Sequence, residues 1–314
     1  MAQAIYTQTT IAMVWDFDKT LIPGYSQKPI FEEYGIDEAR FWREVNGLED
    51  LYRRRDLLVA KDTAYLLHML SYVREGAMAG LTNSKLVELG ARIEMCPGIP
   101  DFLPHIQELV ASDDRFASHG ISVEHYIVST GIRHLIEGSS VSAHVQKIWA
   151  NEFVDQPPGP GYDPATHEFE ANDGVIAQVG YMIDNTSKTR AIFEINKGPD
   201  VEVNARMAEE ERKVPIKNMI YIADGPSDVP VFSVVGVNGG RRLGVYQTAE
   251  PSNFEGVKQL EDDARVDSIA EANFMQGTQA WRWLTSEVRR IGTRICDDRD
   301  RYLAAVKAPA GHIT

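Results

Sequence analysis

Cysteine, long apolar runs and basic residues are all scarce in this chain, and each scarcity excludes a class of protein. The 314 residues include two cysteines, Cys96 and Cys296, which are too few for a disulfide framework or a cysteine-rich zinc site. They fit a reducing compartment, where each would serve as a small buried apolar residue. No apolar run reaches the roughly 18 residues of a membrane-spanning helix, so we expect no membrane partner.

Positive charge is outweighed by negative charge. The chain has 46 Asp and Glu against 32 Lys and Arg, a formal net charge of -14. This disfavours nucleic acid or an anionic membrane as a general partner. The apolar stretch near the N-terminus has no basic region ahead of it, so it is not typical of a signal peptide. With 43% hydrophobic residues to form a core, we predict a soluble, cytoplasmic protein.

Four short apolar runs, each followed by a small or polar residue, predict buried parallel strands of an α/β sheet. The runs cover residues 11–15, 125–128, 181–183 and 219–223. Another strand is expected at 243–246. Ligands of such sheets bind beyond the carboxyl ends of the strands, where Asp16, Ser129 and Asp224 follow their runs.

A long helical insert separates the first two runs. Residues 38–55, 61–75 and 83–93 have mixed polar and apolar faces with few helix breakers, which predicts helices. The insert is far too long for a tight crossover. We therefore divide the chain into an α/β core formed by 1–21 and 97–314, with a helical tail from about 250, and a helical cap domain formed by 22–96.

The remaining segments are a loop excursion and the tail. The stretches 148–154 and 174–183 are extended in pattern and flank the loop QPPGPGYDPAT, which predicts a hairpin and not a domain. In the tail, one apolar stripe recurs every three or four residues. It packs against the sheet or, alternatively, forms a homodimer contact. The stripe consists of Trp281, Leu284, Val288, Ile291 and Ile295.

Two carboxylates, Asp16 and Asp18, directly follow the first apolar run in the string VWDFDKTL. Where a strand unwinds into a loop, side chains two residues apart can take different roles. Asp16 can face the open end of the sheet as nucleophile and metal ligand, and Asp18 can act as general acid and base. The structural alternative is a pair of turn-forming residues.

A second acidic pair, Asp224 and Asp228, lies in IADGPSD after the fourth run. If this loop faces Asp16, several negative charges crowd together unless a hard cation lies among them. Oxygen ligands of this kind suit Mg²⁺, which takes one or two carboxylates together with a substrate phosphate. An aspartate that caps a helix is the alternative.

Ser129 and Lys188 are weaker signals. A hydroxyl with neighbouring backbone amides at an expected helix start can cradle phosphate, and a lysine can neutralise a phosphoryl oxygen and pair with a nucleophilic carboxylate. Each alone is typical of a helix cap or a solvated charge. Their order along the chain, between the two acidic pairs and after apolar runs, indicates a shared site.

The four motifs resemble those of the haloacid dehalogenase superfamily of phosphotransferases. The matching residues are DFDKT at 16–20, Ser129, Lys188 and DGPSD at 224–228. The resemblance covers residues from about 11 to 246 and implies a Rossmann-like, three-layer, parallel-sheet core. For the insert it implies the helical cap of the phosphoserine-phosphatase-like branch. The loop at 156–164 and the tail after 247 have no counterpart in it.

The resemblance also implies roles for the acidic residues. Asp16 would form an aspartyl-phosphate, and Asp18 would protonate the leaving alcohol and then activate water. Mg²⁺ would be bound by Asp16, by the backbone carbonyl of Asp18 and by Asp224, with Asp228 as a further ligand or a supporting acceptor. Such chemistry needs positioning and charge neutralisation.

The phosphate-binding residues follow from the same resemblance. Ser129 and Lys188 would hold the phosphoryl oxygens, helped by backbone amides near Phe17 and Gly131. The cap would close over the site and exclude water, which favours a small phosphorylated metabolite as substrate. The triplet 53–55, all arginine, could select a second anionic group, but a solvated helix face is the simpler interpretation.

The motif residues favour one activity among several within the superfamily. Asp18 and Thr20 match the phosphatase pattern, whereas Lys19 stands where sugar phosphomutases often have glycine. A phosphatase is therefore expected, with a phosphotransferase or phosphomutase as the alternative. A catalytically silent phosphate-ligand-binding protein or a phospho-accepting signalling module would be further alternatives. The histidines lack ligand spacing and are interpreted as structural or surface groups.

Overall fold

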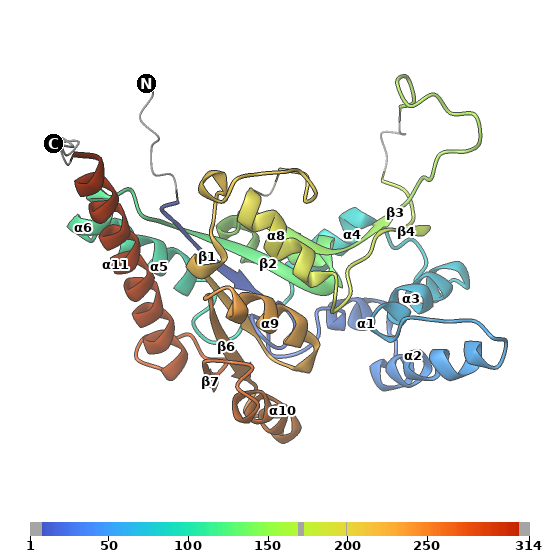
Figure 1. Cartoon of the computed structure of the whole chain (residues 1–314). Helices are drawn as coiled ribbons and strands as arrows, with labels where there is room; N and C mark the ends of the chain where they lie inside the picture. The colour runs from blue at the N-terminus through green and yellow to red at the C-terminus, as the bar shows by residue number, and fades with distance from the viewer. Residues whose placement is uncertain (1–7, 169–172, 199, 308–314) are drawn as a thin grey trace.

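The computed structural model describes residues 8–168, 173–198 and 200–307, and a mixed sheet forms its centre (Figure 1). Seven strands of the described chain lie in the order β4-β3-β2-β1-β5-β6-β7. All neighbouring pairs are parallel except β3 and β4. The strands are β1 (Thr10–Trp15), β2 (Ser122–Ile132), β3 (Lys147–Val154), β4 (Gln178–Tyr181), β5 (Met219–Ala223), β6 (Arg241–Tyr246) and β7 (Ser268–Glu271).

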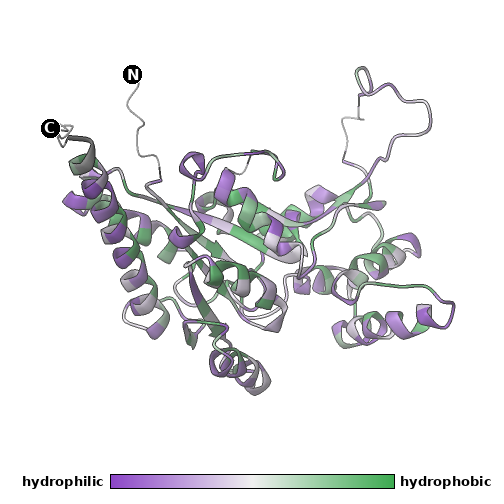
Figure 2. Cartoon of the chain, viewed as in Figure 1, coloured by the Kyte–Doolittle hydropathy of each residue, from purple (hydrophilic) through white to green (hydrophobic). Residues whose placement is uncertain are grey.

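Helices cover both faces of the sheet. In β1, Met13 and Trp15 belong to the apolar core on one face, which includes residues of α5 and α11. Val14 belongs to the core on the other face, with residues of α8 and α9. Figure 2 shows the resulting pattern, with apolar strands inside and polar outer helix surfaces. This three-layer α/β architecture confirms the predicted fold class. The helices are α5 (Phe102–Ala111), α6 (Asp114–Ser118), α7 (Arg133–Gly138), α8 (Lys188–Lys197), α9 (Val229–Val237), α10 (Pro251–Asp262) and α11 (Gln279–Lys307).

Residues 22–96 contain four α-helices, and the periodicity of the insert predicts the last three of them. The four helices are α1 (Lys28–Tyr34), α2 (Glu38–Arg53), α3 (Ala64–Arg74) and α4 (Asn83–Gly90). They have an apolar core of their own, which includes Phe41, Met69 and Leu86 and continues onto Leu135 of α7. The division into a cap of 22–96 and a two-part core stays a prediction.

Close backbone packing holds α4 against α7. A Cβ atom on Gly90 would lie 2.2 Å from the carbonyl oxygen of Leu135, and one on Gly138 would lie 1.9 Å from that of Val87. Only glycine allows the two backbones to approach this closely. These two glycines therefore set how the helices of the insert sit on the rest of the chain.

Two local predictions were wrong. The third run was expected to form a buried parallel strand over 181–183, but β4 ends at Tyr181 and is antiparallel to β3. It lies at the sheet edge because the chain returns from β3 as a hairpin, and that hairpin was predicted. Ser129 was expected at a helix start, yet it lies within β2, which continues to Ile132 because Ile132 pairs with Asn151 of β3. The helix α7 begins only at Arg133.

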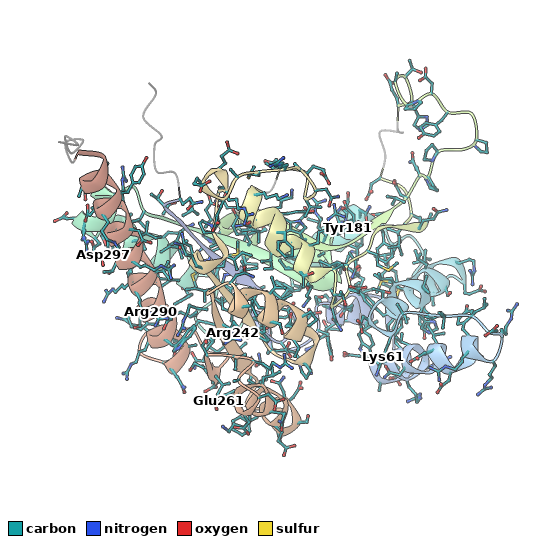
Figure 3. The ribbon with its side chains drawn as sticks, in the orientation of Figure 1. Lys61, Tyr181, Arg242, Glu261, Arg290 and Asp297 are labelled. Carbon is teal, nitrogen blue, oxygen red and sulfur yellow. The ribbon has the colours of Figure 1, made fainter. Side chains whose placement is uncertain are left out.

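The tail contributes β7 to the sheet, and its helices α10 and α11 pack against the strands. Leu284, Val288, Ile291 and Ile295 of the predicted stripe are at most 1% exposed and belong to the main core. The stripe therefore packs within the chain, and its own face is not available to a second copy. The opposite face of α11 carries Arg290 and Asp297 (Figure 3). In the described part of the chain, no helix combines the length and apolar character needed to cross a membrane.

Candidate active site

The carboxyl ends of β1 and β5 bring the two acidic motifs together. Asp16 follows β1 directly and Asp224 follows β5 directly. The backbone N–H of Asp16 donates to the carbonyl oxygen of Ile222 at 2.9 Å, which extends the pairing of the two strands by one residue. Because neighbouring parallel strands end at the same edge, the loops that follow them face each other.

Lys188 connects the two acidic loops. Its Nζ donates to Oδ1 of Asp16 at 2.9 Å and to Oδ1 of Asp228 at 2.7 Å. All three side chains are buried, with Lys188 only 1% exposed. Tyr221 also donates its hydroxyl to Asp228 Oδ1, and Ser227 donates to Oδ2 at 2.8 Å.

A tight turn ahead of α8 directs Lys188 inward. Asp184 Oδ1 accepts hydrogen bonds from the backbone N–H groups of Thr186 and Ser187, at 2.9 and 2.6 Å. Such a turn is the preferred local structure of the Asp-Asn-Thr-Ser string. The backbone N–H of Ile183 donates to Oδ1 of Asn151 at 2.8 Å, which anchors this turn to β3.

The electrostatics of the cluster indicate a shortage of positive charge. Burial raises the pKa of Asp16 well above its usual value, despite Lys188. Burial and the charge of Asp228 raise the pKa of Asp224 to about 7, and burial raises that of Asp18 to about 6. Burial would lower the pKa of Lys188, but Asp16 and Asp228 hold it above its usual range. One lysine does not balance this set of acids.

The donor set fits a hard divalent cation. Carboxylate oxygens of Asp16, Asp224 and Asp228 lie within 4.8 Å of one another, and this cluster of the described residues contains no histidine or cysteine. Oxygen-only, negatively charged sites suit Mg²⁺. Because Asp228 already accepts from Lys188 and Tyr221, it suits a supporting position better than direct binding. The carboxylate of Asp18 lies outside this cluster, and a metal contact through its backbone carbonyl stays a prediction.

Asp18, Ser129 and Gly131 lie together beside the cluster. Asp18 Oδ1 accepts from the backbone N–H of Ser26 at 2.9 Å, and Ser129 Oγ accepts from that of Gly131 at 2.9 Å. A Cβ atom on Gly131 would lie 3.1 Å from Ser26 Oγ, 3.2 Å from Ser129 Oγ and 3.5 Å from Asp18 Oδ2. The missing side chain leaves room among three oxygens. Phe17 is buried, and its carbonyl accepts from Leu21 at 2.9 Å to turn the chain.

Other sequence-selected residues lie outside the cluster. The arginine triplet 53–55 is exposed at the end of α2, and Arg53 pairs with Glu49 and Asp50 of its own helix. A solvated helix face is thus the better interpretation of this triplet. Sequence reasoning missed three residues at the site, Tyr221, Gln247 and Asn253. Tyr221 is a polar residue in an otherwise apolar strand, which is a detectable signal, whereas the other two lie in the unmatched tail.

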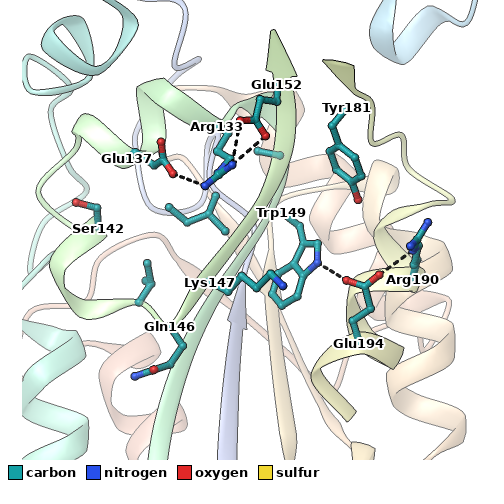
Figure 4. A pocket seen from close by; sticks show the side chains of 13 residues that line it. Arg133, Glu137, Ser142, Gln146, Lys147, Trp149, Glu152, Tyr181, Arg190 and Glu194 are labelled. Carbon is teal, nitrogen blue, oxygen red and sulfur yellow. Dashed lines mark hydrogen bonds and ion pairs between the residues drawn. The ribbon is translucent and has the colours of Figure 1, made fainter. Parts of the chain in front are cut away.

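A cavity of about 290 Å³ borders the site at Asp224. Its lining includes Lys19, Asp224, Ser227 and Asn253. A larger cavity of about 590 Å³ lies elsewhere, between α7, β3 and α8 (Figure 4). Its arginines pair with its glutamates: Figure 4 shows Arg133 paired with Glu137 and Glu152, and Arg190 paired with Glu194. Of the three clustered carboxylates, Asp224 lines the smaller cavity.

Comparison with known proteins places the chain in a family and identifies its fold. No protein-family model matches it. It is 37% identical over 282 residues to an uncharacterised protein of Borreliella burgdorferi, covering 90% of this chain and 97% of that protein. The chain belongs to the same family as that protein.

Solved structures share the fold at low sequence identity. A probable phosphoserine phosphatase from Vibrio cholerae aligns with 93% of this chain and 69% of its own, at 14% identity and a TM-score of 0.50. A gene product from Archaeoglobus fulgidus aligns with 95% of this chain and 88% of its own, at 12% identity and a TM-score of 0.51. The chain has the haloacid dehalogenase-like fold of phosphoserine phosphatases.

Proposed function

We propose that this chain, with its haloacid dehalogenase-like fold, is a Mg²⁺-dependent phosphatase that hydrolyses a small phosphomonoester through Asp16. The observation that carries the proposal is the buried cluster of Asp16, Asp224 and Asp228 around Lys188. Burying several carboxylates with a single lysine costs stability, so a structural purpose alone explains it poorly. Phosphoryl transfer requires such a site, because it depends on positioning and charge neutralisation.

In the first step, a carboxylate oxygen of Asp16 attacks the phosphorus atom. The bond from phosphorus to the ester oxygen breaks, and Asp18 gives its proton to the departing alcohol. Lys188 and Ser129 hold the non-bridging oxygens while the aspartyl-phosphate forms. Asp16 and Asp224 would hold Mg²⁺, which would neutralise the phosphate charge when bound. The raised pKa of Asp18 keeps a proton available for donation near pH 6.

In the second step, Asp18 acts as a base. It takes a proton from a water molecule, whose oxygen attacks the phosphorus atom of the aspartyl-phosphate. The bond from phosphorus to Asp16 breaks, so the carboxylate is restored and inorganic phosphate leaves. Asp18 thus gives up a proton in the first step and takes one in the second, which explains the need for a second carboxylate close to the nucleophile.

The enclosure of the site supports a small soluble substrate. Asp16 is 5% exposed, which favours a small phosphate ester over a phosphate carried on a folded protein. Both cysteines are free and buried, which is consistent with the predicted cytoplasmic location. A homodimer stays a prediction.

Turnover of p-nitrophenyl phosphate with Mg²⁺ tests the nucleophile. We expect Asp16→Asn to abolish turnover, because an amide cannot form the phosphoenzyme. The surface variant Asp262→Asn, which removes an exposed partner of Lys258, serves as control and should keep full activity. Substantial activity in Asp16→Asn would refute the assignment.

Asp18→Asn separates the two steps. The p-nitrophenolate group departs without a proton, so the first step does not need Asp18, whereas water attack does. We expect Asp18→Asn to release about one p-nitrophenolate per enzyme in a burst. Further p-nitrophenolate should then be released slowly, because hydrolysis of the aspartyl-phosphate limits each later turnover. A uniform slow rate without a burst would contradict the two-step role of Asp18.

A further inference from the structure

The segment from Gln247 to Asn253, at the start of the tail, contacts both carboxylate loops. It joins β6 to the first turn of α10, and α10 packs against the short turn Pro226–Asp228. Its side chains reach Asp224 on one side and Lys19 on the other. No motif of the sequence indicated a role for this segment.

The side-chain amide of Asn253 is oriented by the backbone. Its Oδ1 accepts from the backbone N–H of Gln247 at 2.7 Å. Because a backbone N–H can only donate, the opposite end of the amide must be the Nδ2 group. Nδ2 donates to Oδ2 and to the carbonyl oxygen of Asp224, both at 3.2 Å.

The loop after Asp18 is held by the same segment. Gln247 Nε2 donates to the carbonyl oxygen of Lys19 at 2.9 Å, and Lys19 Nζ pairs with Glu250 at 2.7 Å. Lys19 has a left-handed backbone, with φ of 56°, a conformation that needs support from its surroundings. The segment 247–253 thus ties the two catalytic loops to one another.

We propose that Asn253 is a positioning residue that orients Asp224 for cation binding. The inference rests on the proposed Mg²⁺-dependent function. Asp224 is only partly buried and borders the cavity of about 290 Å³, so its carboxylate would otherwise be free to rotate toward solvent. The neutral amide holds one oxygen and adds no charge, which leaves the other oxygen available. Partners of this kind commonly change metal affinity by about 10- to 100-fold.

A purely structural role is the competing explanation. Asn253 also closes the loop ahead of α10, whose N-cap residue Glu250 makes no side-chain capping bond. In that case its loss would lower stability and leave metal affinity unchanged. Metal affinity of the folded protein therefore distinguishes the two explanations.

Isothermal titration of the full chain with MgCl₂, without substrate, provides the test. We expect Asn253→Ala to bind Mg²⁺ about 10- to 100-fold more weakly than the unsubstituted protein. Gln259→Ala, on the same helix with an exposed bond to Asp263, is the matched control and should bind within twofold. For turnover, the Mg²⁺ concentration at half-maximal rate should rise in parallel, with the KM for the phosphate ester unchanged.

The outcomes separate this inference from the proposed function. If the unsubstituted protein binds Mg²⁺ and Asn253→Ala binds it equally tightly, the positioning role is refuted and the phosphatase proposal stands. If the unsubstituted protein binds no Mg²⁺, the proposed function itself fails. Circular dichroism at the assay temperature checks folding. Should Asn253→Ala be unfolded, Asn253→Ser is titrated instead and judged by the same criterion.

Discussion

Replacing Lys188 by methionine removes the positive charge that two buried carboxylates share. Asp16 and Asp228 both lie within 3 Å of its Nζ, at 2.9 and 2.7 Å. Methionine keeps much of the volume and leaves packing largely intact. Removing one partner of a buried ion pair costs about 3–5 kcal/mol. In a chain of this length, a loss of about 4 kcal/mol lowers Tm by roughly 6 °C.

The destabilisation by Lys188→Met should depend on pH. Without the lysine, burial and the charge of Asp228 both raise the pKa of Asp16 unopposed. A carboxyl whose folded pKa exceeds its unfolded pKa destabilises the fold more as pH rises above the unfolded value. The difference between variant and unsubstituted protein should therefore be largest above pH 7 and shrink as the pH falls toward 5.

Thermal unfolding in EDTA, at pH 8 and pH 5, measures this effect. Lys258→Met is the matched control, because Lys258 is 45% exposed and pairs with acids on its own helix. It should change stability by no more than about 0.5 kcal/mol. A Tm for Lys188→Met equal to that of the control at pH 8 would show that the lysine does not balance the buried acids, and the charge argument would fail.

Two further predictions concern the core and the helix packing. His125 is buried, and burial lowers its pKa in the folded protein to about 4. Between about pH 6.5 and 4 the imidazole is therefore protonated in the unfolded chain but not in the folded one, so the free energy of unfolding falls as the pH falls through this range. From pH 7 to pH 5, the free energy of unfolding measured in urea should fall by about 2 kcal/mol more in the unsubstituted protein than in His125→Gln. An equal fall in both proteins would contradict this prediction. Gly138→Ala should cost about 1–3 kcal/mol, because its Cβ would lie 1.9 Å from the Val87 carbonyl oxygen. Gly47→Ala, in an open position of α2, should instead gain about 0.5–1 kcal/mol, and thermal melts that reversed this order would refute the packing argument.

Local patterns predicted the elements whose signal is contained in their own residues. The runs ending at Trp15 and Ala223 form β1 and β5, and the insert forms α2, α3 and α4. These segments are apolar or periodic over several consecutive residues, so burial on one or both faces determines their structure. The apolar stripe of α11 packs as predicted for the same reason.

Elements whose structure depends on distant partners were missed. β7 has only four residues, Ser268–Glu271, and acquires its extended form by pairing with β6. The direction of β4 was predicted wrongly because hydropathy does not distinguish parallel from antiparallel pairing at a sheet edge. Ser129 was placed at a helix start, whereas pairing of Ile132 with Asn151 keeps this stretch in β2.

The sequence alone determined which residues were candidates for the proposed site, and the tertiary structure decided their arrangement. Asp16, Asp18, Ser129, Lys188 and the acidic pair after β5 could be selected because each follows an apolar run. Only the fold brought Lys188 between Asp16 and Asp228 and left the carboxylates short of positive charge. It also brought Asn253 from the tail to Asp224. These contacts join residues far apart in the chain, so their distances follow from strand order and packing and not from any local pattern.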